Sequence, residues 1–347
     1  MESIYHSRKD WVEFSNASIY ISGATGMLAS YLVLFFIYLN EHHNQNISIY
    51  AGIRNIGKAE KIFGTYSQRP YIHWIVSDIT LPFTLDTQLD YVIHAASLAS
   101  PQYYGGSPVE TMLPNIVGTN ELLKWCRSFP VKSFLFFSSG AVYGTVKNLP
   151  AISESAIGTM DFLADGNVYG ESKRCGEALC HAYFKEYSIP TKCARIHHTY
   201  SPTMDIAYDK RAFSEFVSNI VHGEDIVLKS DGSAKRSFCY ITDGLSALLK
   251  ILLDGKNGES YNVGNNKEYV SIRELAELLV SLFPEKKLKL SVSARIESGY
   301  QSIPENQSIP LDIKKLNKLG WVPTVTIKEG FYRTICFIEQ KNNTIDN

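Results

Sequence analysis

The feature that most constrains the fold is an alternation of short apolar segments with helical segments along residues 18–196. The apolar segments are almost continuously hydrophobic, which is typical of parallel strands buried on both faces. Parallel strands need crossover connections, and the intervening segments have helical patterns. We predict strands at residues 18–22, 47–51, 72–76, 90–96, 133–137 and 191–196, and helices at 27–39, 58–63, 109–126 and 169–184.

A glycine-rich turn joins the first strand to the first helix. Gly23 and Gly26 let the backbone turn tightly and approach a pyrophosphate, and the following helix supplies free N–H groups. The turn therefore predicts a dinucleotide site and an α/β fold, a Rossmann doubly wound parallel sheet with a smaller mixed C-terminal substrate lobe. We assign residues 18–196 to the dinucleotide-binding domain, residues 197–335 mostly to the substrate lobe, with some segments returning to the first domain, and residues 1–17 to an N-terminal extension.

Bulk properties argue against several kinds of partner. The chain has 347 residues, 45% apolar and 20% charged, with a net charge of −1 and no basic tract, so we expect no nucleic-acid partner. The apolar run at residues 31–39 is shorter than the ~20 residues that span a bilayer, and residues 1–17 lack a signal-peptide core, so we expect no membrane segment. Six cysteines without a Cys-x-x-Cys pair predict buried thiols in a cytoplasmic protein.

The second strand ends without the acid that binds the ribose of NAD. Residues 50–55 end in Arg54 and Asn55, Lys58 follows, and an arginine suits a 2′-phosphate. We therefore favour NADP(H), with NAD(H) as the alternative; Arg54 and Lys58 could also be solvated surface charges. Asp78 is placed to meet the adenine. The predicted cofactor contacts are Gly23, Thr25, Gly26, Met27, Arg54, Asp78, Ile79, Ala95, Ala96, Tyr169, Lys173 and His197.

Tyr169 and Lys173 lie four residues apart, so they share one face of a helix. An ammonium beside a phenol lowers the pKa of the phenol towards working pH. Tyr169 is thus a candidate proton donor or acceptor for a sugar hydroxyl or ketone. Such a pair also occurs by chance on solvated helices, but the glycine-rich turn and Ser138-Ser139 after the fifth strand strengthen the assignment.

Taken together, the motifs resemble the extended short-chain dehydrogenase/reductase family that acts on nucleotide-diphosphate sugars, over about residues 18–335. Similar in pattern are UDP-glucuronate decarboxylase-like members, sugar 4-epimerases and 4-ketoreductases. The motifs are Gly23-x-x-Gly26-x-x-Ala29, His94-Ala95-Ala96, Ser138 to Gly144, Tyr169-x-x-x-Lys173, Arg195 to Pro202 and Arg236 to Asp243.

The resemblance implies a role for each matching residue. Ser139, rather than Ser138, hydrogen-bonds the reacting sugar oxygen, Tyr169 is the acid/base, and Lys173 lowers its pKa and holds the nicotinamide ribose. Asn115 supports the neighbouring helix. No metal is expected, because no carboxylate or cysteine accompanies the two consecutive histidines at ligand spacing. The predicted substrate contacts are Ser139, His198, Arg211, Leu228 and Arg236, with exposed ion pairing as the alternative for both arginines.

The chain departs from two branches of that family after Ser139. The 4,6-dehydratases carry an Asp-Glu pair where Gly140 and Ala141 stand. The decarboxylases carry a glutamate at the position of Ala141 and an arginine near residue 302, where this chain reads Gln301-Ser302-Ile303. Both water elimination and decarboxylation are therefore disfavoured.

Ketoreduction and 4-epimerisation need only Ser139, Tyr169, Lys173 and a nicotinamide. Because no acid follows the second strand, we expect NADPH-dependent reduction at C4 of a nucleotide-diphosphate 4-keto-6-deoxyhexose, dTDP-linked, in the biosynthesis of a surface-polysaccharide sugar such as an O-antigen component. The alternatives are a nucleotide-sugar 4-epimerase, a UDP-glucuronate decarboxylase-like enzyme and a non-catalytic NADP-binding protein. The resemblance also implies a homodimer formed through the helices at 109–126 and 169–184.

Overall fold

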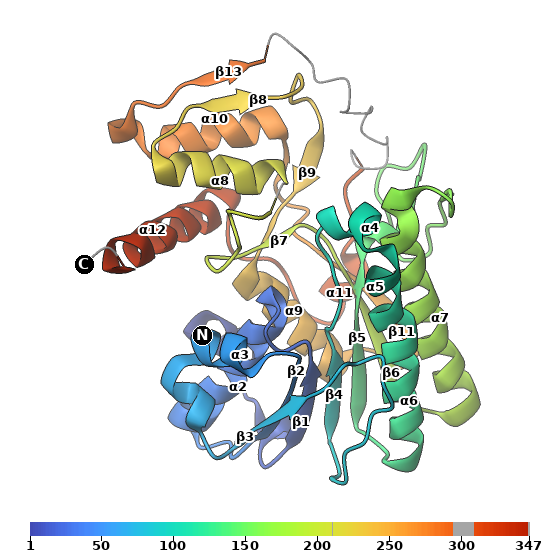
Figure 1. Ribbon diagram of the computed structural model, residues 1–347. Coiled ribbons are helices and arrows are strands. Elements are labelled where there is room, and N and C mark those ends of the chain that lie inside the picture. Colours follow the sequence, from blue (N-terminus) through green and yellow to red (C-terminus); the bar gives the residue numbers. More distant parts are fainter. Residues whose placement is uncertain (210, 294–308, 346–347) are drawn as a thin grey trace.

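Seven parallel strands form the central sheet of the protein (Figure 1). The computed structural model describes residues 1–209, 211–293 and 309–345, and the sheet order is β11-β6-β5-β4-β1-β2-β3. This sheet confirms the predicted fold class, and each of the predicted strands has a counterpart in it. Its strands are β1 (Ser18–Ser22), β2 (Ser48–Ile53), β3 (Ile72–Val76), β4 (Tyr91–His94), β5 (Ser133–Ser139), β6 (Thr191–Ile196) and β11 (Glu259–Val263).

Helices cover both faces of the sheet because each strand is apolar on both sides. Successive side chains of a strand point to opposite faces. In β5, Leu135 and Phe137 belong to one buried cluster, whereas Phe134 and Phe136 belong to the other. The first cluster packs under α2 (Met27–His43), α3 (Ile56–Phe63) and α9 (Ile241–Asp254), and the second under α6 (Thr119–Ser128) and α7 (Val168–Tyr187). The short α5 (Pro108–Leu113) and η3 (Pro114–Gly118) pack against α7.

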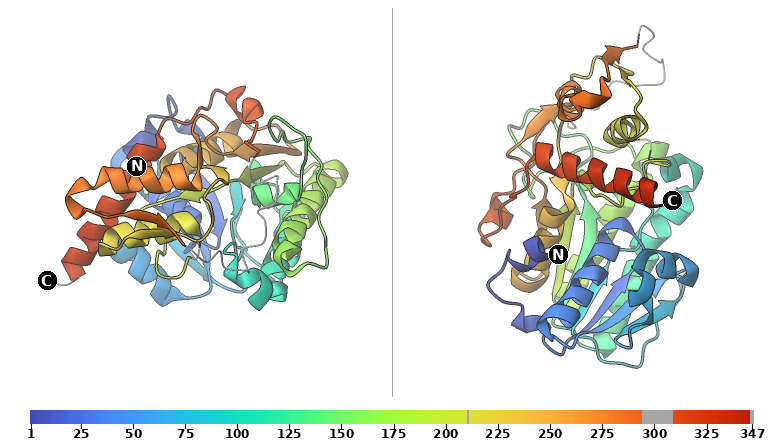
Figure 2. Two further views of the ribbon diagram at one scale, coloured as in Figure 1. Left: turned by 90° about the horizontal axis from the view of Figure 1, so that it is seen from above. Right: turned by 90° about the vertical axis from the view of Figure 1, so that its left-hand side faces the viewer.

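A smaller lobe lies beyond the carboxyl ends of the strands (Figures 1 and 2). Its two-stranded pairs are β10 with β7, β12 with β9, and β13 with β8. The C-terminal helix crosses between this lobe and the sheet domain. The elements concerned are β7 (Thr199–Tyr200), α8 (Ala212–His222), β8 (Ile226–Leu228), β9 (Lys235–Ser237), β10 (Cys239–Tyr240), β12 (Tyr269–Ser271), α10 (Ile272–Leu282), β13 (Leu290–Val292) and α12 (Ile327–Ile345).

Two elements late in the chain return to the large sheet. Helix α9 packs against β5 and β6, and β11 extends the sheet beside β6. Strand β11 was not predicted, because its sequence Glu259-Ser260-Tyr261-Asn262-Val263 lacks a continuous apolar run. The side chain of Asn262 is nevertheless buried, because its amide donates to the carbonyls of Ile152 and Asp312.

The predicted helix at 109–126 is interrupted by a π-helical turn. Pro114 has no N–H to continue the α-helical hydrogen-bond ladder, so the turn widens to η3 before α6 begins. The Pro114 carbonyl oxygen lies 3.0 Å from Nε2 of His94, and the Asn115 amide donates to Thr111 O and Ser172 Oγ. Asn115 therefore braces the helix beside the site, as the sequence predicted.

The apolar run at residues 31–39 lies within α2, with Leu32, Val33, Phe35 and Phe36 fully buried. No helix in the described ranges is long and apolar enough to cross a membrane. The remaining short helices are α1 (Glu2–Tyr5), η1 (Val12–Phe14), η2 (Gly64–Gln68), α4 (Gln102–Gly106), η4 (Gly140–Tyr143), η5 (Asp165–Asn167), η6 (Pro284–Lys286) and α11 (Lys314–Asn317).

Candidate active site

A large crevice lies between the carboxyl ends of the strands and the smaller lobe. Its volume is about 1970 Å³, and it opens where the strand order reverses between β1 and β4, the usual ligand position in such sheets. The predicted residues that line it are Thr25, Gly26, Met27, Ala95, Ser139, Tyr169, Lys173, His197, His198, Arg211 and Arg236. The predicted residues outside its lining are Gly23, Arg54, Asp78, Ile79, Ala96 and Leu228.

The glycine-rich turn shapes the cofactor end of the crevice. Gly23 has a φ of +64°, and a Cβ there would lie 2.7 Å from Cα of Ala96, so only glycine fits without strain. Gly26 is the N-cap of α2, and its N–H donates to Gly23 O at 2.8 Å. The free N–H groups in the first turn of α2 therefore face the crevice beside Met27, where a pyrophosphate would bind.

A buried histidine fixes the next strand against this turn. The Ser22 hydroxyl oxygen accepts from the N–H groups of Ala95 and Ala96 at 3.0 and 3.1 Å, so its own proton is donated to His94 Nδ1 at 2.7 Å. Burial lowers the pKa of His94 to about 3, and the neutral ring donates from Nε2 to the carbonyl of Pro114. His94 is thus a structural brace for the loop that carries Ala95.

On the side of the crevice where the adenosine is expected, Arg54, Asp78 and Ile79 lie outside the lining, and their cofactor contacts stay predictions. Asp78 Oδ1 accepts from the backbone N–H and the hydroxyl of Thr80, which lowers the pKa of Asp78. Ile79 packs against η3, where a Cβ on Gly118 would lie 3.0 Å from it. The cations that line the crevice on this side include Lys58 and Lys61 of α3.

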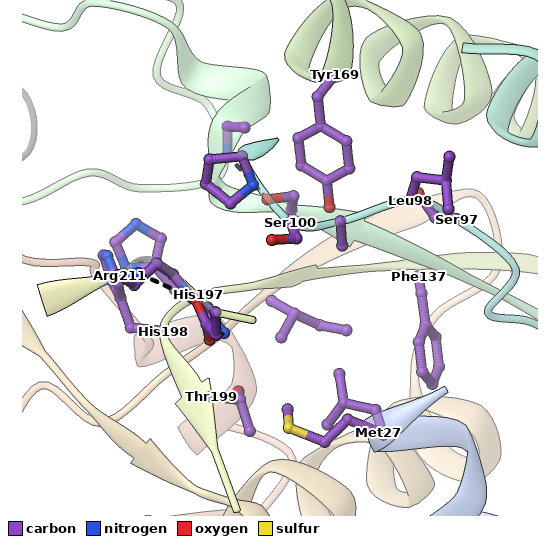
Figure 3. Close-up of a pocket in the computed structure, with 18 of the residues that line it drawn as sticks. Met27, Ser97, Leu98, Ser100, Phe137, Tyr169, His197, His198, Thr199 and Arg211 are labelled. Carbon is purple, nitrogen blue, oxygen red and sulfur yellow. Dashed lines mark hydrogen bonds and ion pairs between the residues drawn. The ribbon is translucent and has the colours of Figure 1, made fainter. Parts of the chain in front are cut away.

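Tyr169 and Ser139 meet at the centre of the crevice. Ser139 is the last residue of β5, Tyr169 lies in the first turn of α7, and the two hydroxyls are hydrogen-bonded. Figure 3 shows the Tyr169 hydroxyl pointing into the pocket. Burial raises the pKa of Tyr169 to about 12, although the bond from Ser139 and the nearby Arg211 act in the opposite direction. The pKa of Tyr169 is therefore raised and not lowered as expected, because burial outweighs the favourable contacts.

Lys173 lies one helical turn after Tyr169 and is fully buried. Its ammonium donates to the carbonyl of Phe137 at 2.5 Å and lies 5.6 Å from the centre of the Tyr169 ring. Burial lowers the pKa of Lys173 to about 7, and Glu177 partly opposes this. Lys173 therefore gives up its proton more readily than an exposed lysine, and it lines the crevice beside Tyr169.

Tyr104 is a crevice residue that the sequence reasoning missed. Its ring stacks on that of Tyr169, with centroids 4.8 Å apart and planes 7° from parallel, and its hydroxyl donates to Ala99 O at 2.9 Å. The stack shields one face of the phenol from water. The signal in the sequence was its position in the loop after the fourth strand, where ligand-binding loops gather.

Behind the crevice, an ion pair connects β5, β6 and α7. Arg195 donates to Glu177 Oε2 at 2.7 Å and to the Tyr143 hydroxyl at 2.9 Å, and Ser138 donates to Glu177. Ser138 is thus occupied as a structural hydroxyl, which leaves Ser139 for the crevice. The Glu177 carboxylate was also missed, although it follows Lys173 by one turn on the same helix face.

Cations and imidazoles gather at the end of the crevice next to the smaller lobe, which we call the sugar end because the predicted substrate contacts lie there. Arg211 makes a two-pronged pair with Asp209, at 2.6 and 2.9 Å, and Arg236 Nη1 donates to Lys235 O at 2.7 Å. Figure 3 shows His197, His198 and Arg211 gathered on one side of the pocket. Leu228 instead lies in the hydrophobic core of the lobe, 2% exposed, because strand β8 points it inward.

Burial, assisted by the nearby arginines, keeps both imidazoles neutral. Burial and Arg236 lower the pKa of His197 to about 4, and burial, His197 and the two arginines hold the pKa of His198 well below its usual range. The Nδ1 atoms of the two rings are 3.1 Å apart and share one hydrogen bond. Within the described part of the chain, no group of three or more His, Cys, Asp and Glu side chains could hold a metal ion.

Comparisons with known proteins agree with this geometry. The model of the NAD dependent epimerase/dehydratase family matches residues 19–264. The chain belongs to this family. UDP-glucuronic acid decarboxylase 5 of Arabidopsis thaliana is 30% identical over 316 residues, which cover 91% of this chain and 87% of that protein. The chain is thus an enzyme of the nucleotide-sugar epimerase/dehydratase type.

Solved structures of the same fold include two nucleotide-sugar epimerases. UDP-glucose 4-epimerase of Thermotoga maritima, with UDP-glucose, has a TM-score of 0.75 at 21% identity over 94% of this chain and 99% of that one. UDP-glucuronic acid 4-epimerase of Bacillus cereus, in complex with UDP-glucuronic acid and NAD, has a TM-score of 0.73 at 24% identity over 93% and 99%.

Proposed function

We propose that this chain reduces the C4 keto group of a nucleotide-diphosphate 4-keto-6-deoxyhexose, dTDP-linked, with NADPH. The observation that carries the proposal is the Ser139–Tyr169 pair in the crevice, with Lys173 one turn away and no acid at Gly140 or Ala141. Two hydroxyls and an ammonium suffice for a reaction that adds one hydride and one proton to a ketone. Dehydration and decarboxylation need further acids or bases that these positions lack.

The protonation states favour donation of a proton. With a pKa of about 12, Tyr169 retains its proton at neutral pH and can give it to the C4 oxygen. Ser139 would hold the same oxygen, and Arg211 and the Lys173 ammonium would stabilise the phenolate that remains. The nicotinamide, when bound, supplies the hydride to C4.

The cofactor preference rests on the cations of α3. NADPH carries a 2′-phosphate that NADH lacks, and Lys58 and Lys61 line the adenosine side of the crevice. Strand β2 ends at Ile53 without a carboxylate for a free 2′-hydroxyl. Proteins of similar structure bind NAD, so NAD(H) is the alternative.

A second candidate is C4 epimerisation of a UDP-hexuronate. The same three catalytic residues serve it, and the cationic sugar end formed by Arg211 and Arg236 would suit a sugar carboxylate as well as a diphosphate. A relative acts as a UDP-glucuronic acid decarboxylase, and a protein of similar structure is a UDP-glucuronic acid 4-epimerase. The segment around Gln301-Ser302-Ile303, where decarboxylases carry an arginine, lies outside the described residues.

One pair of assays separates the candidates. With dTDP-4-keto-6-deoxyglucose, we expect steady oxidation of NADPH and one reduced sugar formed per cofactor consumed. Rapid conversion of UDP-glucuronate to its C4 epimer, without net change of the cofactor, would show that the protein is an epimerase and not a reductase. Release of carbon dioxide from UDP-glucuronate would instead favour the decarboxylase, and no turnover with any of them would favour a non-catalytic NADP-binding protein.

We also propose a cytoplasmic homodimer that supplies a surface-polysaccharide sugar. All six cysteines are free thiols, which suits a reducing compartment. Helices α5, α6 and α7 pack side by side on one face of the molecule, and α5 exposes Val109 and Leu113 there. Sedimentation of the purified protein would test the assembly.

A further inference from the structure

The turn after β5 contains a feature that the predicted catalytic residues do not explain. β5 and β6 are paired in parallel, with Ser139 opposite Ile196, so Gly140 and His197 follow side by side. A Cβ at position 140 would lie 2.1 Å from Cδ2 of His197 and 2.8 Å from its Nε2. His197 therefore occupies the space that any other residue at position 140 would need.

The Cδ2–Nε2 edge of this imidazole faces the space beside Gly140, in the lining of the crevice. Its Nδ1 is engaged with Nδ1 of His198 at 3.1 Å, and among the described residues its Nε2 has no hydrogen-bond partner. His197 lines the crevice, and its ring lies against Gly140, the residue that follows Ser139. A polar nitrogen left unpaired in such a place is paired by a ligand or by water.

We propose that His197 is a specificity-determining residue that hydrogen-bonds a hydroxyl of the hexose ring, on a carbon adjacent to the reacting one. Ser139 and Tyr169 flank the reacting oxygen, so a nitrogen on the Gly140 side reaches the neighbouring ring substituent. Either tautomer serves, because a hydroxyl can donate as well as accept. The proposal rests on a nucleotide sugar as ligand and holds for reductase and epimerase alike.

The groups around His197 favour this use over proton transfer. Burial and the nearby Arg236 lower the pKa of His197 to about 4, so the ring is neutral throughout the working pH range. The other titratable groups at this end of the crevice are His198 and Arg211. A neutral ring can orient a sugar without adding a charge. It thereby selects among sugars by the presence and direction of one hydroxyl.

The test measures binding, so that it is independent of which reaction occurs. Dissociation constants for dTDP-glucose and for dTDP alone are measured by calorimetry in the presence of NADP+, and repeated with UDP-glucose and UDP. For each base, the sugar increment is the dissociation constant of the nucleotide diphosphate divided by that of the nucleotide sugar. We expect His197→Phe, which keeps an aromatic ring but loses the nitrogen, to reduce the increment about fivefold without altering the affinity for dTDP.

Two further variants separate hydrogen bonding from packing. His197→Gln, whose amide can reach the position of Nε2, should restore most of the increment. Gly140→Ala should displace the imidazole and cause the same loss, and Gly140→Ala combined with His197→Phe should lose no more than either alone. His222→Ala, a change to an exposed histidine on α8, is the control and should have no effect.

Equal losses for dTDP and dTDP-glucose in His197→Phe would overturn the proposal, because the residue would then only support the fold. A change confined to the dissociation constant of the cofactor would also overturn it and would assign His197 to the nicotinamide. Failure of the proposed reaction is seen separately, as absence of turnover by a wild-type protein that still shows the sugar increment.

Discussion

At the cofactor end of the crevice the chain presents backbone, whereas at the sugar end it presents charged side chains. Gly23, the first turn of α2 and the small Ala95 let a dinucleotide lie against main-chain atoms. Arg211 and Arg236 reach the sugar end from the smaller lobe. Ligand binding at the cofactor end should therefore depend on backbone geometry, and binding at the sugar end on the charge and length of the side chains.

The largest effect is expected where the two ends meet. Tyr169→Phe removes the proton donor and should lower kcat by about 10²–10⁴-fold, with little change in the KM of either ligand. Tyr183→Phe is a matched change on the same helix, where the hydroxyl donates to Asn120, and should leave kcat within about twofold. Steady-state kinetics measure both, and an active Tyr169→Phe protein would remove the phenol from the mechanism.

Gly23→Ala tests the dependence of the cofactor end on backbone geometry. A left-handed φ costs a residue with a Cβ about 1–2 kcal/mol, and the contact with Ala96 adds about 1–3 kcal/mol. Gly223→Ala is the control, because Gly223 has a left-handed φ of +72° and a Cβ there meets nothing within 4 Å. Urea unfolding should show a clearly larger loss for Gly23→Ala. Equal losses would mean that the close approach to Ala96 is unimportant.

Arg236→Gln tests the role of charge at the sugar end. Loss of a charged hydrogen bond to a diphosphate should raise the KM of the nucleotide sugar about 10- to 100-fold. The KM of the cofactor should stay constant, because Arg236 lies in the smaller lobe. A parallel rise in both constants would indicate that the variant distorts the whole crevice instead.

Lys58→Ala tests the role of charge at the cofactor end, where it removes one of the charged side chains that line the crevice. It should raise the KM of NADPH about tenfold and leave that of NADH nearly unchanged, because only NADPH carries the 2′-phosphate. Lys328→Ala, in the first turn of α12 and outside the lining of the crevice, is the matched control. An unchanged preference would point to NAD(H) as the working cofactor.

The pH dependence of stability tests the cost of burying Lys173. Burial lowers its pKa to about 7 from an ordinary value of 10.5, so between these values the unfolded chain binds more protons than the folded one. The stability of wild type relative to Lys173→Met should therefore rise as the pH increases from 7 to 10. Urea unfolding at several pH values measures this, and a falling difference would contradict the assigned burial cost.

Much of the cofactor end was predictable because its signals are local. Continuous apolar runs predicted the strands of the sheet apart from β11, and the glycine spacing placed the turn before α2. Arg54, Asp78 and Ile79 were less well placed, since a position at a strand end does not tell which way a side chain points. The crevice instead brings in Lys61, from one turn further along α3.

The sugar end was less predictable because its neighbours come from distant parts of the chain. Leu228 was expected to touch substrate but belongs to the lobe core. Tyr104, which stacks on Tyr169, and Glu177, which pairs with Arg195, have roles that depend on how helices and strands pack. Their spacing along the chain carries no such information.

By itself the sequence determined the alternating α/β order, the glycine-rich turn and the presence of Ser139, Tyr169 and Lys173, because these depend on residues close together in the chain. Tertiary structure alone decided that burial raises the pKa of Tyr169 and that His197 fills the space left by Gly140. A pKa and a van der Waals contact are set by whatever surrounds a group, and only the folded chain assembles those surroundings.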